Sequence, residues 1–374
     1  MRITDVEALV LRMPHIDVGA ADSTQDALIV RVHTDEGIVG IGEVDASPTV
    51  VKAVIDAPPS HAISSGLREI LIGEDPRDIE RLWDKMYQGS VFYGRRGVAI
   101  MALSGLDIAL YDILGKKLGV PVYRLLGGAR RKSVPAYAST LMPDTPEEAQ
   151  EHASELAARG FKAMKFGWGP FGQSEDLDEE LVAAVRRGAG EQVEILLDIG
   201  FGWRNADHAI KMTRRIERYR PFWIEEPLLP DDVDGYARLA GAVDVPIAAG
   251  EENTTRYEFS DLLERGRVDI VQPDVTRCGG LTEAKRIAAL AHARGKPCVP
   301  HAWSTGVISA ASLHLIATIP NALFLEYCVR PNPLNTSLVK NPVQVKDGVA
   351  TVPEAPGLGV ELDEAELARF AVQA

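Results

Sequence analysis

The chain has 374 residues, of which 46% are hydrophobic and 25% are charged, and its formal net charge is −14. This composition is typical of a globular protein, and the length favours two domains. The strong negative charge argues against nucleic acid or an anionic membrane as a partner.

The cysteines and the N-terminus indicate the compartment. Cys278, Cys298 and Cys328 are an odd set in strand-like contexts, which favours buried thiols over disulfides or a zinc site. The first residues contain no apolar signal-peptide core, and no uninterrupted apolar run reaches the ~18 residues of a membrane span. We therefore expect a cytoplasmic protein with no membrane partner.

The first 45 residues have the pattern of β-strands. Strands are predicted at residues 6–12, 27–34 and 38–43, and a short hairpin turn joins the last two. The loop at residues 14–26 is longer than a minimal hairpin requires. Such loops serve as lids or specificity loops, or they are plain surface loops, and the sequence leaves both readings open.

From about residue 50 to residue 130 the pattern becomes helical. Ile79, Leu82, Trp83 and Met86 recur at helical spacing, and residues 98–118 are apolar enough for a central buried helix. A Gly-Gly pair with basic neighbours follows at residues 127–128. Because no P-loop lysine accompanies this pair, it indicates a domain junction rather than a phosphate site.

Eight short apolar runs alternate with helical segments after residue 133. The runs lie at residues 134–138, 163–166, 195–198, 222–226, 246–251, 270–274, 298–301 and 323–326. Eight β–α units predict an α/β fold, a (β/α)8 TIM-like barrel, with an active site at the C-terminal ends of the strands. We expect an N-terminal α+β domain at 1–130, the barrel at 131–335, and a C-terminal tail at 336–374 that returns to the first domain.

Three of these strands end in a carboxylate. Asp198, Glu225 and Glu251 follow one another at intervals of 27 and 26 residues, about one β–α unit each. Because side chains alternate along a strand, Glu225 points into the barrel and Glu226 points away, and Glu251 is likewise preferred to Glu252. A lone acid at a strand end is more often a helix cap or part of a surface ion pair. Three acids in register predict a Mg²⁺ site, since Mg²⁺ prefers hard oxygen ligands.

Other strand ends carry groups that can move protons. Asp274 and His301 end adjacent strands, so the carboxylate can orient the imidazole and raise its basicity. Lys165 lies across the barrel mouth, where we expect a depressed pKa and a role as base or as carboxylate clamp. Glu326 adds an inward carboxyl group on the eighth strand. Taken singly, the His and the Lys could be structural, and it is their position opposite the acids that favours function.

A metal ion between a His–Asp dyad and a Lys suits one kind of reaction. A proton next to a carboxylate is weakly acidic, because its removal adds a second negative charge. Bound Mg²⁺ stabilises that charge as an enediolate, and the flanking groups transfer protons. The sequence thus predicts an enzyme that acts on a small-molecule carboxylate substrate.

Four motifs carry a resemblance to a known family. They are Trp223-Ile-Glu225-Glu-Pro, Gly250-Glu251, Gln272-Pro-Asp274 with Cys278-Gly-Gly, and Val299-Pro-His301. Together they resemble the enolase superfamily, and within it the mandelate racemase subgroup, over nearly the whole chain. The resemblance implies a modified barrel with an α+β capping domain, which the N-terminal region and the C-terminal tail form together.

The resemblance also implies a role for each candidate residue. The Mg²⁺ ligands would be Asp198, Glu225 and Glu251, and His301 with Asp274 would be the acid/base dyad. Glu326 would hydrogen-bond the substrate carboxylate and stabilise the enediolate. Loops at about 14–26 and 45–50 would shape the distal part of the substrate pocket. Such enzymes are commonly closed homo-oligomers.

Two positions depart from the subgroup pattern. The subgroup usually has Lys-x-Lys at the end of the second barrel strand, where this chain has Lys165-Phe-Gly167. It often has Asn where this chain has Gly200. Both losses open one side of the site, and the missing second Lys is the usual base opposite the His. The residues that could refill this side are Trp168, Trp203 and Arg204.

One-base chemistry led by His301 therefore fits better than racemisation. We predict dehydration of a sugar acid, an aldonate or an aldarate, to a 2-keto-3-deoxy acid, with Lys165 as electrostatic partner or alternative base. A racemase, epimerase or lactone cycloisomerase of the same superfamily is the first alternative. A metal-dependent sugar isomerase or aldolase on a TIM barrel, and a non-catalytic acid-binding protein, are more distant alternatives.

Overall fold

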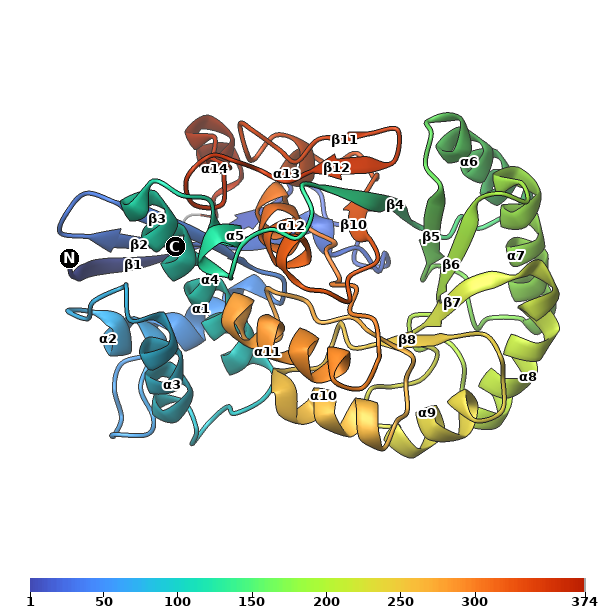
Figure 1. Ribbon diagram of the computed structural model, residues 1–374, viewed down its shortest axis with the longest axis horizontal. Helices are drawn as coiled ribbons and strands as arrows, with labels where there is room; N and C mark the ends of the chain where they lie inside the picture. The colour runs from blue at the N-terminus through green and yellow to red at the C-terminus, as the bar shows by residue number, and fades with distance from the viewer. Residues whose placement is uncertain (373–374) are drawn as a thin grey trace.

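The computed structural model describes residues 1–372, and its N-terminal region is an antiparallel sheet packed against helices (Figure 1). The sheet has the order β1–β2–β3. Its strands are β1 (Ile3–Arg12), β2 (Asp26–Thr34), which the short 3-10 turn η1 (Ser23–Gln25) precedes, and β3 (Val39–Val44). The helices are α1 (Pro48–Asp56), α2 (Leu67–Leu71), α3 (Ile79–Gly89), α4 (Val98–Leu118) and α5 (Val122–Leu125). The three predicted strands and the buried helix are confirmed.

Helix α4 is the centre of this region. It is long and apolar enough to cross a membrane by length and composition, but 83% of its most apolar window is buried inside the protein. It packs closely against β3, because a Cβ atom built on Gly42 would lie 1.9 Å from the carbonyl oxygen of Gly105. The helix therefore serves as the core on which the sheet rests.

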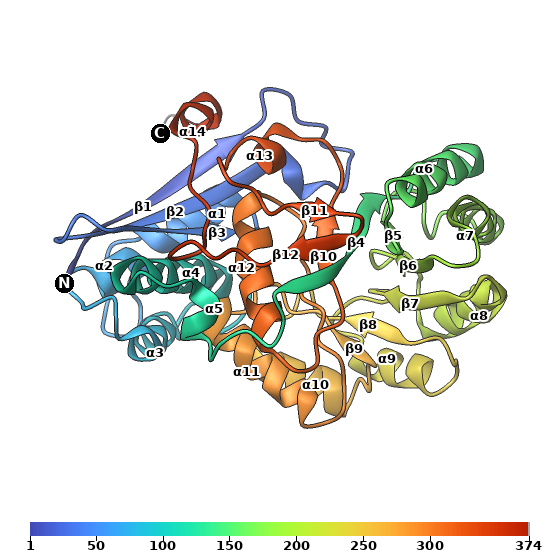
Figure 2. The same ribbon diagram turned by 45° about the horizontal axis from the view of Figure 1, so that its top comes forward.

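The barrel follows in alternating β–α units, which Figure 2 shows from a second direction. Its strands are parallel neighbours, and the last of them pairs with the first. The strands are β4 (Ser133–Leu141), β5 (Ala163–Gly167), β6 (Glu194–Asp198), β7 (Pro221–Glu225), β8 (Ile247–Ala249), β9 (Ile270–Val271) and β10 (Leu325–Cys328). The outer helices are α6 (Pro146–Ala158), α7 (Glu175–Ala189), α8 (Ala206–Ile216) with the 3-10 turn η2 (Glu217–Tyr219), α9 (Val233–Ala240), α10 (Thr255–Glu264), α11 (Gly280–His292) and α12 (Gly306–Thr318). This arrangement is the predicted α/β fold.

The strand predicted at residues 298–301 is reduced to one bridge, between Val271 and Cys298. Single hydrogen bonds continue the ring there: the Val299 amide donates to the Val271 carbonyl at 2.9 Å, and the Cys298 amide donates to the Asn321 carbonyl at 3.0 Å. The strand prediction was too long at this point because the chain leaves the ladder to form the loops of the barrel mouth. The last barrel strand also begins two residues later than predicted.

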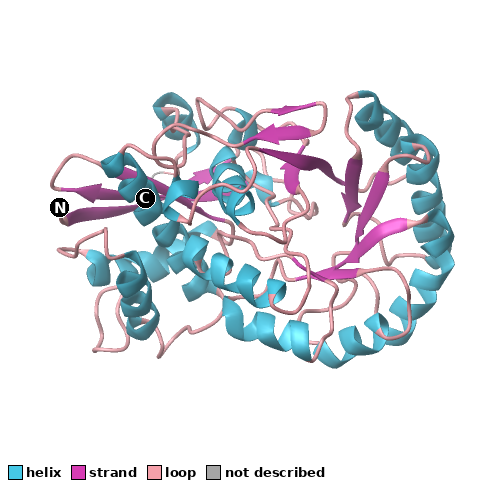
Figure 3. Cartoon of the chain, viewed as in Figure 1, coloured by secondary structure: helices cyan, strands magenta, loops and turns pink. Residues whose placement is uncertain are grey.

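The C-terminal tail touches both parts of the molecule (Figure 3). After α13 (Pro333–Thr336), the hairpin of β11 (Val345–Lys346) and β12 (Val349–Thr351) adds to the barrel, where β12 pairs antiparallel with β4. Helix α14 (Glu364–Phe370) then reaches the N-terminal sheet, and the Val372 amide donates to the Val10 carbonyl at 2.8 Å.

Inside the barrel, alternation along the strands separates two sets of side chains. Ala163 and Leu196 face the interior, whereas Met164 and Phe166 pack outward against the helices. The full interior layer is Tyr137, Ala163, Leu196, Trp223, Ala248, Ile270 and Val299. This layer closes the bottom of the barrel, so that the inward residues one or two steps further along each strand reach the mouth.

The contact between α4 and β3 gives a stability prediction. We expect Gly42→Ala to lower the free energy of unfolding by about 3 kcal/mol, because its methyl group has no room beside the Gly105 carbonyl. Denaturant unfolding measures the change. Gly19→Ala is the matched control, since its new Cβ would meet only a side-chain oxygen of Asp17 at 3.3 Å. Equal stability of the two variants would contradict the packing described here.

Candidate active site

Three carboxylates from successive strands meet at the barrel mouth. Asp198 ends β6, Glu225 ends β7 and Glu251 follows β8, and one oxygen from each lies within 4.8 Å of the others. All three side chains are buried. The Oε2 atom of Glu251 has no hydrogen-bond partner among the described residues. Buried carboxylate oxygens are normally paired or coordinated, so this oxygen-only set fits a divalent cation.

The pKa shifts of the three-carboxylate cluster also fit a divalent cation. Burial and the charge of Glu225 raise the pKa of Asp198 to about 7. Burial likewise raises the pKa of Glu251 well above its usual range, although His301 opposes the shift. The cluster is therefore short of positive charge even with Lys165 beside it, and a bound cation would restore the ionised state of its ligands.

Neighbouring side chains fix the direction of Glu225. Its Oε2 atom accepts hydrogen bonds from Trp223 Nε1 at 2.9 Å and from Gln272 Nε2 at 2.7 Å. Glu226 turns away, as strand alternation predicts, and accepts a hydrogen bond from the Tyr236 hydroxyl of α9 at 2.6 Å. One acid of the pair thus serves the site and the other serves the packing of the barrel against α9.

Lys165 lies among the acids. Its Nζ atom pairs with Glu225 Oε1, lies 2.9 Å from Glu326 Oε1, and lies 3.5 Å from Asp198 Oδ2. Burial alone would lower the pKa of Lys165, but the charges of Glu225 and Glu326 outweigh it and raise the pKa well above its usual value. The depressed pKa that we expect beside a metal is thus not seen in the protein alone, because the acids surround the ammonium group closely.

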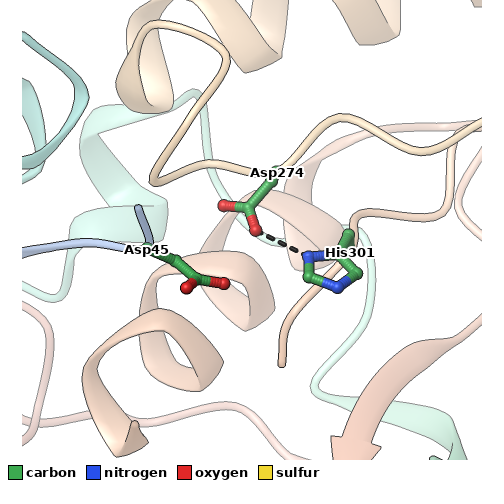
Figure 4. Close-up of side chains that lie close together, drawn as sticks. All are labelled: Asp45, Asp274 and His301. Atoms are coloured by element: carbon green, nitrogen blue, oxygen red, sulfur yellow. Dashed lines mark hydrogen bonds and ion pairs between the residues drawn. The ribbon is translucent and has the colours of Figure 1, made fainter. Parts of the chain in front are cut away.

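His301 and Asp274 form the predicted pair (Figure 4). His301 Nδ1 and Asp274 Oδ2 are 2.6 Å apart, and the Thr276 amide and hydroxyl both donate to the other oxygen of Asp274 at 2.6 Å. Because Asp274 is held as an acceptor, Nδ1 of the ring carries a proton. This leaves Nε2 facing the cavity, 3.6 Å from Glu251 Oε2.

The charge around His301 makes it a strong base. Burial alone would lower its pKa, but the charges of Glu251 and Glu326, together with the hydrogen bond to Asp274, raise the pKa to about 10. A cation bound by Glu251 would offset part of this effect and bring the pKa back toward neutrality.

Glu326 is enclosed by donors. Its Oε1 atom accepts from Ser139 Oγ at 2.7 Å and lies 2.9 Å from Lys165 Nζ, and its Oε2 atom accepts from the Ala302 amide at 2.8 Å. Burial would raise the pKa of Glu326, but Lys165 and His301 lower it to about 2. The residue is therefore an ionised acceptor, and a hydrogen bond from it to a substrate carboxylate would first require a proton.

Sequence reasoning missed Asp45 and Arg277. Asp45 follows β3 of the N-terminal sheet and approaches the dyad in Figure 4. Arg277 Nη2 is 2.8 Å from Asp45 Oδ2, and Arg277 Nε is 3.7 Å from Asp274 Oδ2. Asp45, Asp274 and His301 come close enough to suggest a second metal site, but the buried guanidinium group already supplies the positive charge there. Two features of the sequence could have indicated them: Asp45 follows the end of a predicted strand, and Arg277 comes three residues after Asp274.

A cavity of about 250 Å³ lies over these groups. Lys165, Asp198, Glu251, His301 and Glu326 line its inner part, and residues 21–23 of the long N-terminal loop line it from above. Asp22 anchors this loop to the barrel, since its Oδ2 atom is 2.8 Å from Arg330 Nε and its Oδ1 atom accepts from Trp303 Nε1 at 3.3 Å. The loop thus covers the cavity.

The space beside Gly167 and Gly200 is filled by neighbouring side chains. A Cβ atom on Gly200 would lie 2.5 Å from the ring of Trp168, so this ring fills the space there. A Cβ atom on Gly167 would lie 2.5 Å from the Cβ of Asp198, so the metal-ligand candidate itself occupies that place. Trp203 instead donates to Asp178 at 3.0 Å, and Arg204 is not part of the cavity wall.

Comparison with known families agrees with the geometry. Residues 3–127 match the family described as "Mandelate racemase / muconate lactonizing enzyme, N-terminal domain". Residues 148–366 match "Enolase C-terminal domain-like". The chain belongs to the enolase superfamily, in its mandelate racemase subgroup. The resemblance seen in the sequence motifs is thereby confirmed.

Individual members of the superfamily are similar over most of their length. The chain is 37% identical to a D-galactarolactone cycloisomerase of Agrobacterium fabrum, with 92% of this chain and 90% of that protein covered. It is 36% identical to an arabinonate dehydratase of Saccharolobus solfataricus, with 91% and 89% covered. The crystal structure of a 3,6-anhydro-D-galactonate cycloisomerase from Zobellia galactanivorans has a TM-score of 0.90 and 33% identity, with both chains fully covered.

The ion pair between Asp45 and Arg277 gives a second prediction. We expect Asp45→Ala to lower the free energy of unfolding by about 3 kcal/mol, because it leaves a buried guanidinium group short of a partner. Asp207→Ala, which breaks an exposed ion pair with Arg238, is the matched control and should change stability little. Denaturant unfolding of both variants distinguishes them, and equal losses would contradict a special role for the buried pair.

Proposed function

We propose that this protein is a Mg²⁺-dependent dehydratase of a sugar acid. One observation carries the proposal: the His301–Asp274 dyad faces the three-carboxylate cluster, while the place of a second base at Gly167 is taken up by Asp198. The names of several relatives agree, since arabinonate, galactonate and rhamnonate dehydratases are 35–36% identical to this chain.

The residues that would hold Mg²⁺ are Asp198, Glu225 and Glu251, because their oxygens converge and Glu251 Oε2 is otherwise unpaired. When bound, the ion would supply positive charge that stabilises an enediolate. Lys165 adds a fixed positive charge on the same side, where it can pair with the substrate carboxylate.

His301 is the proposed base and acid. Its Nε2 atom takes the proton from the carbon next to the carboxylate, and the electrons of that C–H bond move into the enediolate. The bond from the next carbon to its hydroxyl group then breaks, and His301 returns the proton to the leaving oxygen, which departs as water. The resulting enol becomes a 2-keto-3-deoxy acid. Asp274 keeps the ring in one tautomer throughout.

A racemase would need a second base on the opposite face of the substrate. Lys165 is the nearest basic side chain, but its ammonium group is paired with Glu225 and Glu326. Gly167 cannot supply a base. A single residue, His301, that first accepts a proton and then donates it fits elimination better than inversion of a stereocentre.

A lactone cycloisomerase is the second candidate. Two relatives with similarity over nearly the whole chain are named as cycloisomerases, one of a galactarolactone and one of an anhydrogalactonate. The same proton abstraction serves this reaction, except that a ring oxygen leaves and remains attached to the product. The cycloisomerase product has the same mass as its substrate, whereas the dehydration product is lighter by one water molecule.

The dehydration proposal predicts activity on a panel of aldonates and aldarates with Mg²⁺. We expect at least one acid to give a 2-keto-3-deoxy product, detected by a colour reaction for 2-keto acids and by mass spectrometry. His301→Asn should lower kcat by about 10³-fold, because it removes the proton acceptor. If the panel gives no product, or if His301→Asn retains full activity, the proposal is wrong. Products of unchanged mass from the corresponding lactones, tested as a second panel, would favour the cycloisomerase.

The metal ligands can be tested without turnover. Mg²⁺ at about 100 times its Kd should stabilise the wild-type protein by about 2.7 kcal/mol, seen as a rise in Tm. Asp198→Asn and Glu251→Gln should each reduce this rise, because each removes one anionic ligand. Asp231→Asn, at an exposed turn, is the control and should respond like the wild type. A Mg²⁺ response that survives both substitutions would refute the ligand assignment.

A further inference from the structure

We propose that the outer part of the cavity selects the neutral polyol tail of an aldonate and disfavours the second carboxylate of an aldarate. This inference rests on the proposed function of the same site and narrows its substrate class. It is carried by the charges and the aromatic side chains that line the cavity beyond the reacting groups.

The inner and outer layers of the cavity follow from the strands. The barrel strands run toward the mouth, so residues that follow the reactive side chains, on the strand or in the loop after it, lie nearer the mouth. Leu141 lies two residues after Ser139 on β4, Trp168 lies three residues after Lys165 and just beyond β5, and Trp303 lies two residues after His301 in a loop; all three outer residues line the cavity. The inner layer holds the reacting carboxylate, and the outer layer faces the rest of the substrate.

The cations of the inner layer are already matched with acids. Among the described residues that line the cavity, the positively charged or basic side chains are Lys165, Arg277 and His301. Lys165 forms ion pairs with Glu225 and Glu326, and His301 is hydrogen-bonded to Asp274.

Arg277 is equally engaged. It is 2.8 Å from Asp45 and 3.2 Å from Glu252, and it also donates to the Glu251 carbonyl at 3.3 Å. Among the described residues of the wall, a second substrate carboxylate would therefore find no cation that is free of a carboxylate partner.

The outer wall instead presents acids and hydroxyl groups. Asp22 and Glu252 line the cavity outside the three-carboxylate cluster, and Ser23 and Thr140 add hydroxyl groups. Each of the two acids shares an ion pair, Asp22 with Arg330, which lies outside the cavity wall, and Glu252 with Arg277. Because Arg277 also serves Asp45 and Asp274, the acids still outnumber the cations beside the outer wall. Carboxylates accept hydrogen bonds from sugar hydroxyls and repel a like charge, and the repulsion is strong in a partly enclosed space.

Two tryptophan rings complete the outer wall. Trp168 is held by contact with Gly200, and Trp303 is held by its hydrogen bond to Asp22. Flat aromatic faces pack well against the C–H groups of a polyol chain and offer no positive charge. The outer wall as a whole therefore suits an uncharged chain of hydroxyl-bearing carbons.

The test compares two acids that differ only at the far end, D-galactonate and galactarate, with Mg²⁺ present. We expect kcat/KM for galactonate to exceed that for galactarate by at least tenfold. Equal values, or a preference for galactarate, would overturn the inference while leaving the proposed dehydration intact. If neither acid reacts, the proposed function fails for this pair. The inference is then decided by calorimetric binding of the two acids to the Mg²⁺-loaded protein, where galactonate must bind at least tenfold more tightly.

A variant tests the source of the discrimination. Glu252→Gln removes one negative charge from the outer wall and weakens one ion pair of Arg277, so the preference for galactonate should fall about fivefold. Asp231→Asn removes a charge from an exposed turn and should leave the preference unchanged. If Glu252→Gln leaves the preference as in the wild type, the outer acids do not set the selectivity and the inference is wrong.

Discussion

Buried negative charge at the barrel mouth must be balanced, and the rest of the site depends on how this is done. An ionised carboxylate in a dry interior is costly unless it meets a cation or several donors. Lys165 stands among Glu225, Glu326 and Asp198, and Arg277 stands between Asp45 and Asp274. Each cation binds acids from different strands, so the electrostatic balance also holds the mouth of the barrel in one geometry.

The same constraint joins the N-terminal sheet to the barrel. Glu43 of β3 accepts hydrogen bonds from the Thr305 and Ile308 amides at the start of α12, at 3.1 and 2.7 Å. Two residues later, Asp45 binds Arg277. The end of β3 and the residue after it thus cap helix α12 and neutralise Arg277 beside the His301–Asp274 dyad. These contacts hold the N-terminal sheet against the barrel, and Asp22 separately anchors the covering loop to Arg330 and Trp303.

Much of this arrangement was predictable because it follows local rules. Even spacing of Asp198, Glu225 and Glu251 revealed the barrel and its three-carboxylate cluster together, and strand alternation gave the direction of Glu226. The contact between Asp45 and Arg277, 232 positions apart, could not be predicted, since no periodic pattern links residues of separate domains. The pKa of Lys165 in the protein alone could not be predicted for a related reason: it depends on distances to several acids as well as on burial.

The two glycines limit which side chains can stand beside the three-carboxylate cluster. Beside Gly167 the Asp198 side chain leaves no room for a Cβ atom, because the Cβ of Asp198 would be 2.5 Å away. A lysine restored at this position would have to displace a proposed metal ligand before it could act as a base. Beside Gly200 the Trp168 ring already fills the space. The packing of the site thus leaves no place for a second base at these two positions, which is why the proposed mechanism gives the proton chemistry to His301.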